Sequence, residues 1–127
     1  MAATFTTLML DCTDCVKVAT FWAAAMGWEL DEVDDRGGFL IDPSGRSDGM
    51  HVQPVPEPKT AKNRLHFDLR PTGTMQEEVD RLLALGATVR GFIEVDDSFW
   101  TQMRDPEGNE FCVLRGPDDG WDGDPHS

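Results

Sequence analysis

The stretch TLMLDCTDCVKVATFWAAAMG, residues 7–27, decides the fold, because a second stretch of the same length repeats its pattern. The second stretch is HFDLRPTGTMQEEVDRLLALG, residues 66–86, and both stretches begin with alternating apolar residues and end at a glycine. Alternation predicts a strand, and apolar residues at helical spacing predict a helix that stops at the glycine. The sequence therefore predicts a strand followed by a helix twice, with the second copy 59 positions after the first.

Three short strands follow each predicted helix. The first copy predicts a strand over 4–11, a helix over 14–26 and strands over 28–33, 38–42 and 49–53. The second copy predicts a strand over 64–70, a helix over 74–85 and strands over 88–95, 99–104 and 109–114. Both copies carry an Asp-Pro-x-Gly turn before the last strand, at 42–45 and 105–108. The sequence predicts an α+β fold in which two βαβββ modules form one cupped mixed β-sheet, with the helices on its outer face.

The predicted domain covers residues 1–115, with module one over 4–53 and module two over 64–115. Between the modules lies a polar, proline-rich linker, PVPEPKTAKN, over 54–63. The last stretch, GPDDGWDGDPHS over 116–127, has four aspartates and no periodicity, which predicts an acidic flexible tail. The alternative is that Trp121 docks on the domain or on a partner.

Charge excludes several partners. The 127 residues include 11 Lys and Arg against 24 Asp and Glu, a net charge of −13. So acidic a surface repels phosphates, so we expect no nucleic acid and no membrane as a partner. No basic residue precedes the first apolar stretch, and the longest uncharged apolar stretch, 18–28, is too short to cross a bilayer. With three cysteines, an odd number, the sequence predicts a cytoplasmic protein with reduced thiols.

Two of those cysteines form a C-x-x-C pattern, Cys12 and Cys15, ahead of the first predicted helix. This pattern is found in redox pairs. Asp14 as the cap of the helix explains the segment equally well.

Period-two alternation places His66, Asp68 and Arg70 on one side of their predicted strand, away from the helix. On the last strand Glu110 and Cys112 lie on this same side. By the offset of 59, His51 and Gln53 join them, and Asp11 corresponds to Arg70. The apolar residues near this side are Met9, Trp28, Phe39 and Trp100. A mixed polar and apolar lining predicts a small-molecule cleft, and a solvated or dimer-buried face is the alternative.

The two modules resemble the vicinal oxygen chelate superfamily, the group of glyoxalases, bleomycin-resistance proteins and extradiol dioxygenases. The segments that carry the resemblance are DCVKVATFWAAAMGWEL (14–30), NRLHFDLR (63–70), VDRLLALGA (79–87) and DPEGNEFCVL (105–114). They are similar to the small bacterial glyoxalase-like branch, and the resemblance covers about residues 4–115. It implies either a divalent metal ion held on the cupped sheet, or a metal-free dimer that sequesters a ligand.

The positions at which this superfamily holds its metal are Thr7, Gln53, His66 and Cys112. Of these, His66 is a usual ligand and Gln53 a tolerable one, while Cys112 stands where a glutamate is expected. This degraded set implies a homodimeric protein without a cofactor that binds a small organic molecule. The alternative is a lyase, isomerase or dioxygenase of the glyoxalase type that depends on a divalent metal ion.

Two ligand sets serve that alternative: His66 with His51 and Glu110, or His66 with Gln53 and Cys112. Without a metal, the candidates for an acid or base are His66, Asp68 and Glu110. The predicted ligand-binding residues are Thr7, Asp11, Trp28, Phe39, Gln53, His66, Arg70, Trp100 and Cys112. Arg70 either binds an acidic group of the ligand or forms a structural ion pair with Asp11.

Overall fold

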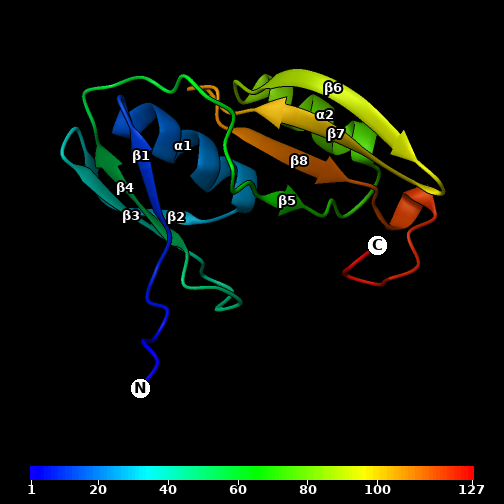
Figure 1. Cartoon of the computed structure of the whole chain (residues 1–127), viewed down its shortest axis with the longest axis horizontal. Coiled ribbons are helices and arrows are strands. Elements are labelled where there is room, and N and C mark those ends of the chain that lie inside the picture. Colours follow the sequence, from blue (N-terminus) through cyan, green and yellow to red (C-terminus); the bar gives the residue numbers. More distant parts are fainter. The chain divides into compact units, whose positions relative to one another are not determined.

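The structure is a computed structural model that describes residues 1–127. It divides into two compact units, Met1–Pro58 and Lys59–Ser127. The first unit holds β1 (Met9–Cys12), α1 (Cys15–Met26), β2 (Glu29–Asp34), β3 (Gly37–Ile41) and β4 (Met50–Pro54). The second holds β5 (Asp68–Leu69), α2 (Met75–Ala84), β6 (Thr88–Val95), β7 (Ser98–Arg104), β8 (Glu110–Leu114) and the short 3₁₀ helix η1 (Pro117–Asp119). The element order confirms the two predicted βαβββ modules (Figure 1).

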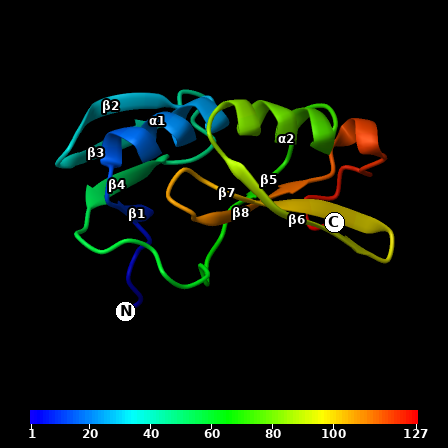
Figure 2. The same cartoon turned by 90° about the horizontal axis from the view of Figure 1, so that it is seen from above.

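Each module builds a four-stranded mixed sheet. The strand orders are β1-β4-β3-β2 and β5-β8-β7-β6. In both sheets the first strand of the module runs parallel to its last strand, and the other neighbours are antiparallel. Each helix packs on the sheet of its own unit (Figures 1 and 2). The α+β prediction is therefore confirmed.

Local sequence sets both helix starts. Asp14 caps α1 by accepting from the backbone amide of Lys17 at 3.1 Å, as the sequence predicts. Thr74 caps α2 in the same way, through the amide of Glu77 at 3.1 Å. At the other end, Gly27 adopts a φ of 69°, a left-handed conformation that suits glycine and ends α1.

One side of each helix supplies the core of its unit. In α1, Val18, Ala19 and Trp22 are fully buried, and in α2 Val79 and Leu82 are buried. These are residues that the helical spacing places on the apolar face. Neither helix is long and apolar enough to cross a membrane.

Two predicted strands are shorter than expected. β1 begins at Met9 and not at residue 4, and β5 contains two residues where the alternation predicts seven. The side chains of Phe5 and Leu65 are 73% and 74% exposed, so the alternation there does not record burial. A strand continues only as far as a neighbouring strand offers hydrogen bonds, and periodicity does not report that limit.

The strand pairing differs from the uniform offset of 59. Asp11 lies opposite Gln53 in the first unit, and Asp68 lies opposite Cys112 in the second. Asp68 is therefore the counterpart of Asp11, and the predicted match between Asp11 and Arg70 is wrong. The cause is the connection from strand to helix, which contains residues 70–73 in the second unit and Thr13 in the first.

Residues 116–127, which follow β8, pack against the rest of the second unit. Asp119 Oδ2 accepts from the backbone amide of Met75, the first residue of α2, at 2.6 Å, and from that of Gly116 at 2.8 Å. The guanidinium of Arg70 lies 4.1 Å from the centre of the Trp121 ring. Trp121 thus docks on the domain, which is the alternative considered for this residue.

Candidate functional site

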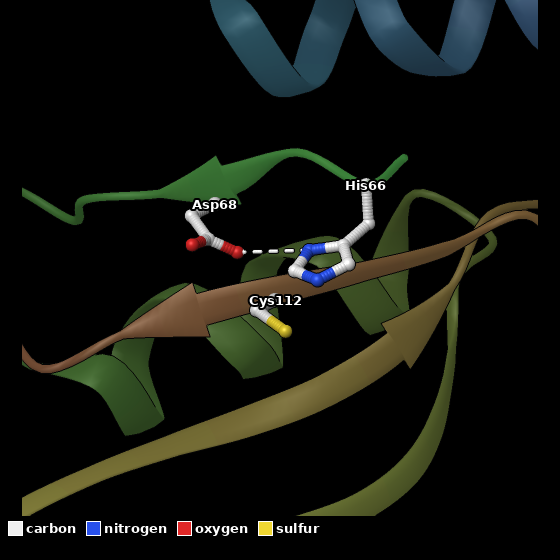
Figure 3. Close-up of side chains that lie close together, drawn as sticks. All are labelled: His66, Asp68 and Cys112. Carbon is white, nitrogen blue, oxygen red and sulfur yellow. Dashed lines mark ion pairs between the residues drawn. The ribbon is translucent and has the colours of Figure 1, made fainter. Parts of the chain in front are cut away.

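Three titratable side chains meet in the second unit: His66, Asp68 and Cys112 (Figure 3). His66 lies two residues before Asp68, which is the first residue of β5. Cys112 lies in the middle of β8. Nδ1 of His66 is 3.0 Å from Oδ1 of Asp68. One nitrogen, oxygen or sulfur atom from each residue lies within 4.8 Å of the other two.

Strand register brings these residues together. His66 and Asp68 are two positions apart, so an extended backbone turns both side chains to one side. The parallel pairing of β5 with β8 sets Asp68 opposite Cys112. The pairing is anchored just before the strand, where the amide of Cys112 donates to the carbonyl of Phe67 at 2.9 Å.

The thiol of Cys112 is held in its protonated form. Burial raises its pKa, and the charge of Asp68 and a hydrogen bond from the thiol to that carboxylate raise it further, to about 11. At neutral pH the thiol is therefore a donor to Asp68 and a poor nucleophile. The Asp68 carboxylate accepts from Cys112 and pairs with His66, so the three groups satisfy one another.

The cluster lies in a cavity of about 610 Å³. Its other lining residues are Ser98, Trp100, Gln102, Leu114, Pro125, His126 and Ser127. The lining combines an indole and an aliphatic side chain with amide, hydroxyl and imidazole groups. Such a combination suits a small organic molecule that has both an apolar part and a hydrogen-bonding part.

Glu110 is engaged elsewhere. Its carboxylate pairs with Lys59 Nζ at 2.8 Å and accepts from the backbone amide of Asn63 at 3.1 Å. Burial raises the pKa of Glu110, but the hydrogen bonds from Lys59 and Asn63 outweigh it and hold the pKa at about 2. These contacts fasten the segment 59–63 to β8. Glu110 is thus separate from the cluster of His66, Asp68 and Cys112, although it shares their strand face in the sequence prediction.

Arg70 also has its own partners. Its Nη1 atom donates to the carbonyl of Arg115 at 2.7 Å, and its guanidinium stacks on Trp121. Burial and the nearby charge of Arg115 lower the pKa of Arg70. Arg70 is not among the residues that line the 610 Å³ cavity, so in this structure its contacts hold the tail.

In the first unit, the predicted site residues form two separate pairs, Gln53 with Asp11 and Phe39 with His51. Gln53 donates to Asp11 at 2.7 Å, and Phe39 packs edge-on against His51 with ring centres 4.4 Å apart. A cavity of about 710 Å³ is lined by Met9, Glu32, Val33, Asp34, Arg36, Gly37, Gly38, Phe39, His51 and Val52. Thr7 and Trp28 lie outside this lining, and the backbone amide of Trp28 donates to the carbonyl of Ala23 at the end of α1.

The donor set in the second unit fits one class of metal ion. Imidazole, carboxylate and thiolate are all zinc ligands, and the cluster offers one of each. Harder ions such as Mg²⁺ and Mn²⁺ prefer oxygen donors, of which the cluster offers only the carboxylate. Binding of any ion requires the Cys112 thiol to release its proton. Asp68 takes the place in this set that the sequence reasoning gave to Gln53 or to Glu110.

Sequence reasoning missed several residues of this cavity. Gln102 lies opposite Cys112 in the antiparallel pairing of β7 with β8, so a correct register for these two strands was the signal that could have found it. Pro125, His126 and Ser127 belong to a segment without periodicity, and no pattern in the sequence places them at the cavity.

Comparison with known proteins agrees with this fold. A family model described as the glyoxalase-like domain matches residues 7–114. No curated protein matches the sequence. A mutant of the fosfomycin resistance protein FosX from Listeria monocytogenes, solved with Mn(II) and 1S,2S-dihydroxypropylphosphonic acid, aligns with a TM-score of 0.71 and 13% identity, over 91% of this chain and 92% of that one.

Two further structures carry broader descriptions. A glyoxalase/bleomycin resistance protein from Albidiferax ferrireducens has a TM-score of 0.59 and 20% identity, over 87% of this chain and 96% of its own. A glyoxalase/bleomycin resistance protein/dioxygenase family enzyme from Burkholderia phytofirmans has a TM-score of 0.65 and 15% identity, over 85% of this chain and 94% of its own. At these identities the likeness concerns the fold.

Proposed function

We propose, from the premise that this chain belongs to the glyoxalase-like domain family, that it binds a small organic molecule in the cavity around His66 without a resident metal ion. The observation that carries the proposal is the set of hydrogen bonds within the cluster. Asp68 is already engaged by His66 and by the Cys112 thiol, and the thiol keeps its proton at neutral pH. A cation bound by all three residues would have to displace the proton of the thiol and both of these hydrogen bonds.

Each lining group has a distinct task in this proposal. Asp68 orients the imidazole through Nδ1, which leaves Nε2 to exchange a hydrogen bond with the ligand. Trp100 offers a flat apolar surface on which a ring can stack. Gln102 offers an amide donor, because its Oε1 atom already accepts from Nη1 of Arg90 at 2.6 Å. The ligand class that matches these groups is a flat phenol, because no Lys or Arg side chain lines the cavity to pair with a carboxylate beside Asp68.

A metal-dependent lyase, isomerase or dioxygenase is the second candidate. The observation that favours it is the convergence of three donors within 4.8 Å. His66, Asp68 and Cys112 would hold the ion, which would polarise an oxygen atom of the substrate. In that case Asp68 would leave its hydrogen bonds with the other two residues.

Metal content and ligand binding separate these candidates. Untagged protein, purified without chelator, is analysed for metals. Its thermal unfolding is followed with a panel of phenols, and with small carboxylic acids for comparison, in the presence and absence of EDTA. We expect less than stoichiometric metal and a stabilising ligand whose effect survives EDTA and is lost in His66→Ala. Thr20→Ala, on the exposed side of α1, is the control for folding and binding.

A different result would favour the metalloenzyme. If about one equivalent of a divalent ion copurifies and His66→Ala releases it, the metal-free proposal is wrong. The variants Asp68→Ala, Cys112→Ala, Gln53→Ala, Glu110→Ala and His51→Ala would then identify the other ligands.

We further propose that the chain forms a homodimer in the cytoplasm. Three apolar side chains of β6, Val89, Phe92 and Val95, are between 46% and 58% exposed, and apolar surface of this kind favours association. All three cysteines are buried thiols, which supports a reducing compartment. Light scattering at micromolar concentration should give a dimer, and Phe92→Glu should weaken it. A monomeric parent protein would contradict the proposal.

A further inference from the structure

Two cysteines that the proposed function does not use lie in contact in the first unit. Cys12 ends β1 and Cys15 begins α1, and their Sγ atoms are 3.1 Å apart. Both side chains are buried, with exposures of 1% and 2%. The third cysteine, Cys112, belongs to the second unit and is described above with the cluster of His66 and Asp68.

The geometry of the pair is close to that of a bond. The sulfur atoms of a disulfide are about 2 Å apart, so these two need to approach by roughly 1 Å. Only Thr13 and Asp14 separate the two cysteines, and the turn that joins β1 to α1 already brings their side chains together. The C-x-x-C spacing at the start of a helix is the arrangement in which dithiols and disulfides interconvert.

We propose that Cys12 and Cys15 are a redox-modifiable pair that a peroxide converts into an intramolecular disulfide. In the first step one thiol releases its proton and the thiolate attacks a peroxide oxygen. The O–O bond breaks to give a sulfenic acid and a hydroxide, which takes up the released proton as water. In the second step the other thiol attacks the sulfenic sulfur, the S–S bond forms, and the departing hydroxide takes up the thiol proton as a second water. The two thiols lose two hydrogens in total, and a small dithiol restores them.

Burial selects the oxidant and favours this product. Side chains that are 1% and 2% exposed are reached only when the structure opens locally, and a peroxide, which is close to water in size, needs a smaller opening than a glutathione-sized disulfide. Once one sulfur is oxidised, its partner at 3.1 Å is the nearest nucleophile, so the disulfide forms ahead of higher oxides.

The modification acts on the first unit. The disulfide would tie the end of β1 to the start of α1, and Met9 at the other end of β1 lines the 710 Å³ cavity with Phe39 and His51. The inference is independent of the cavity around His66, and ligand binding there has no part in its test.

Mass spectrometry of the whole protein tests the pair. The reduced protein is treated with hydrogen peroxide, denatured in an alkylating reagent and digested. We expect a peptide in which Cys12 and Cys15 are joined, with two hydrogens fewer than the reduced form, while Cys112 is alkylated. Dithiothreitol should return both cysteines to the alkylated fraction.

Variants separate the pair from general oxidation. Cys112→Ser should leave the linked peptide unchanged, whereas Cys12→Ser and Cys15→Ser should each abolish it and give sulfinic acid or an alkylated thiol at the remaining position. The proposal is overturned if, in the parent protein, Cys12 and Cys15 remain alkylatable after free cysteine added to the same sample has been oxidised, or if they reach sulfinic acid without forming a link. The parent protein alone decides this outcome, so a poorly folded variant leaves the test intact.

Discussion

Asp68 Oδ1 lies 3.0 Å from Nδ1 of His66, and the same carboxylate accepts the hydrogen bond of the Cys112 thiol. A single acidic side chain thereby fixes the orientation of an imidazole and holds the proton of a buried thiol. Both neighbours depend on its negative charge, so changing that charge without changing the size of the side chain is the sharpest probe of the cavity.

Asp68→Asn should lower the pKa of Cys112. The carboxylate charge disfavours the thiolate, so its removal stabilises the thiolate, while burial, the largest cause, keeps the pKa above the ordinary 9.0. The rate of Cys112 alkylation, followed against pH by mass spectrometry, should rise at a lower pH than in the parent protein. Asp11→Asn, in the first unit, is the matched control. An unchanged profile would mean that the charge of Asp68 does not govern the thiol.

The buried pair of Glu110 and Lys59 predicts a loss of stability in acid. The pKa of Glu110 is 4.5 in the unfolded chain and about 2 in the folded one, so folding favours the ionised form. Its contribution, about 3 kcal/mol, is complete above pH 4.5 and is lost as the pH falls toward 2.

Glu110→Gln should therefore lose stability at pH 7 and little at pH 2.5, as measured by urea unfolding. Removal of the partner in Lys59→Met should give a loss of similar size at neutral pH. Glu94→Gln, on the exposed side of β6, is the control. If Glu110→Gln lowered the free energy of unfolding equally at both pH values, the charge of Glu110 would not be the source of its contribution to stability.

Trp121→Ala should open the cavity around His66. The indole stacks on Arg70 and donates from Nε1 to the carbonyl of Asp124 at 2.7 Å, and these contacts hold the last three residues against the cavity. We expect native-state alkylation of Cys112 at a fixed alkaline pH to accelerate several-fold. Cys12 and Cys15 are internal controls, since both lie in the first unit. Acceleration at all three cysteines would indicate general unfolding instead.

Asp119→Ala should destabilise the second unit by about 1–2 kcal/mol. The carboxylate accepts from two backbone amides, those of Met75 and Gly116, and its loss leaves the first residue of α2 without this acceptor. Thermal or urea unfolding measures the change. Asp118→Ala removes the same charge from an exposed neighbour and should have a small effect. A similar loss in both variants would point to charge rather than to the hydrogen bonds.

Patterns within one element predicted most of the fold. Helix caps, apolar spacing and the Asp-Pro-x-Gly turns depend on neighbouring residues, and the structure bears out the predicted cap at Asp14 and the predicted helix end at Gly27. In the second turn Asp105 accepts from the amides of Glu107 and Asn109, both at 2.9 Å. The lengths of β1 and β5 were not predictable in this way, because each is limited by hydrogen bonds to a strand far away in sequence.

The site was predictable only in part, for the same reason. Alternation placed His66 and Asp68 on one side of the chain, and their distance confirms that placement. Alternation also placed Glu110 beside them, but the carboxylate of Glu110 forms an ion pair with Lys59 instead. Lys59 belongs to a segment for which the sequence predicted only a linker. The approach of the tail depends on one stacking contact between Arg70 and Trp121, which no periodicity encodes.

The hydrogen bond between Gln53 and Asp11 has a consequence for how the two halves of this chain respond to alkaline pH. It occupies the place in the first unit that Cys112 and Asp68 occupy in the second, since both aspartates lie opposite these partners in the strand pairing. In both halves an aspartate on the first strand therefore accepts a hydrogen bond from the last strand. The donor is the amide of Gln53 in the first half and the thiol of Cys112 in the second. The thiol across from Asp68 can lose a proton and the amide across from Asp11 cannot, so a rise in pH toward about 11 adds a negative charge beside the aspartate of the second half only.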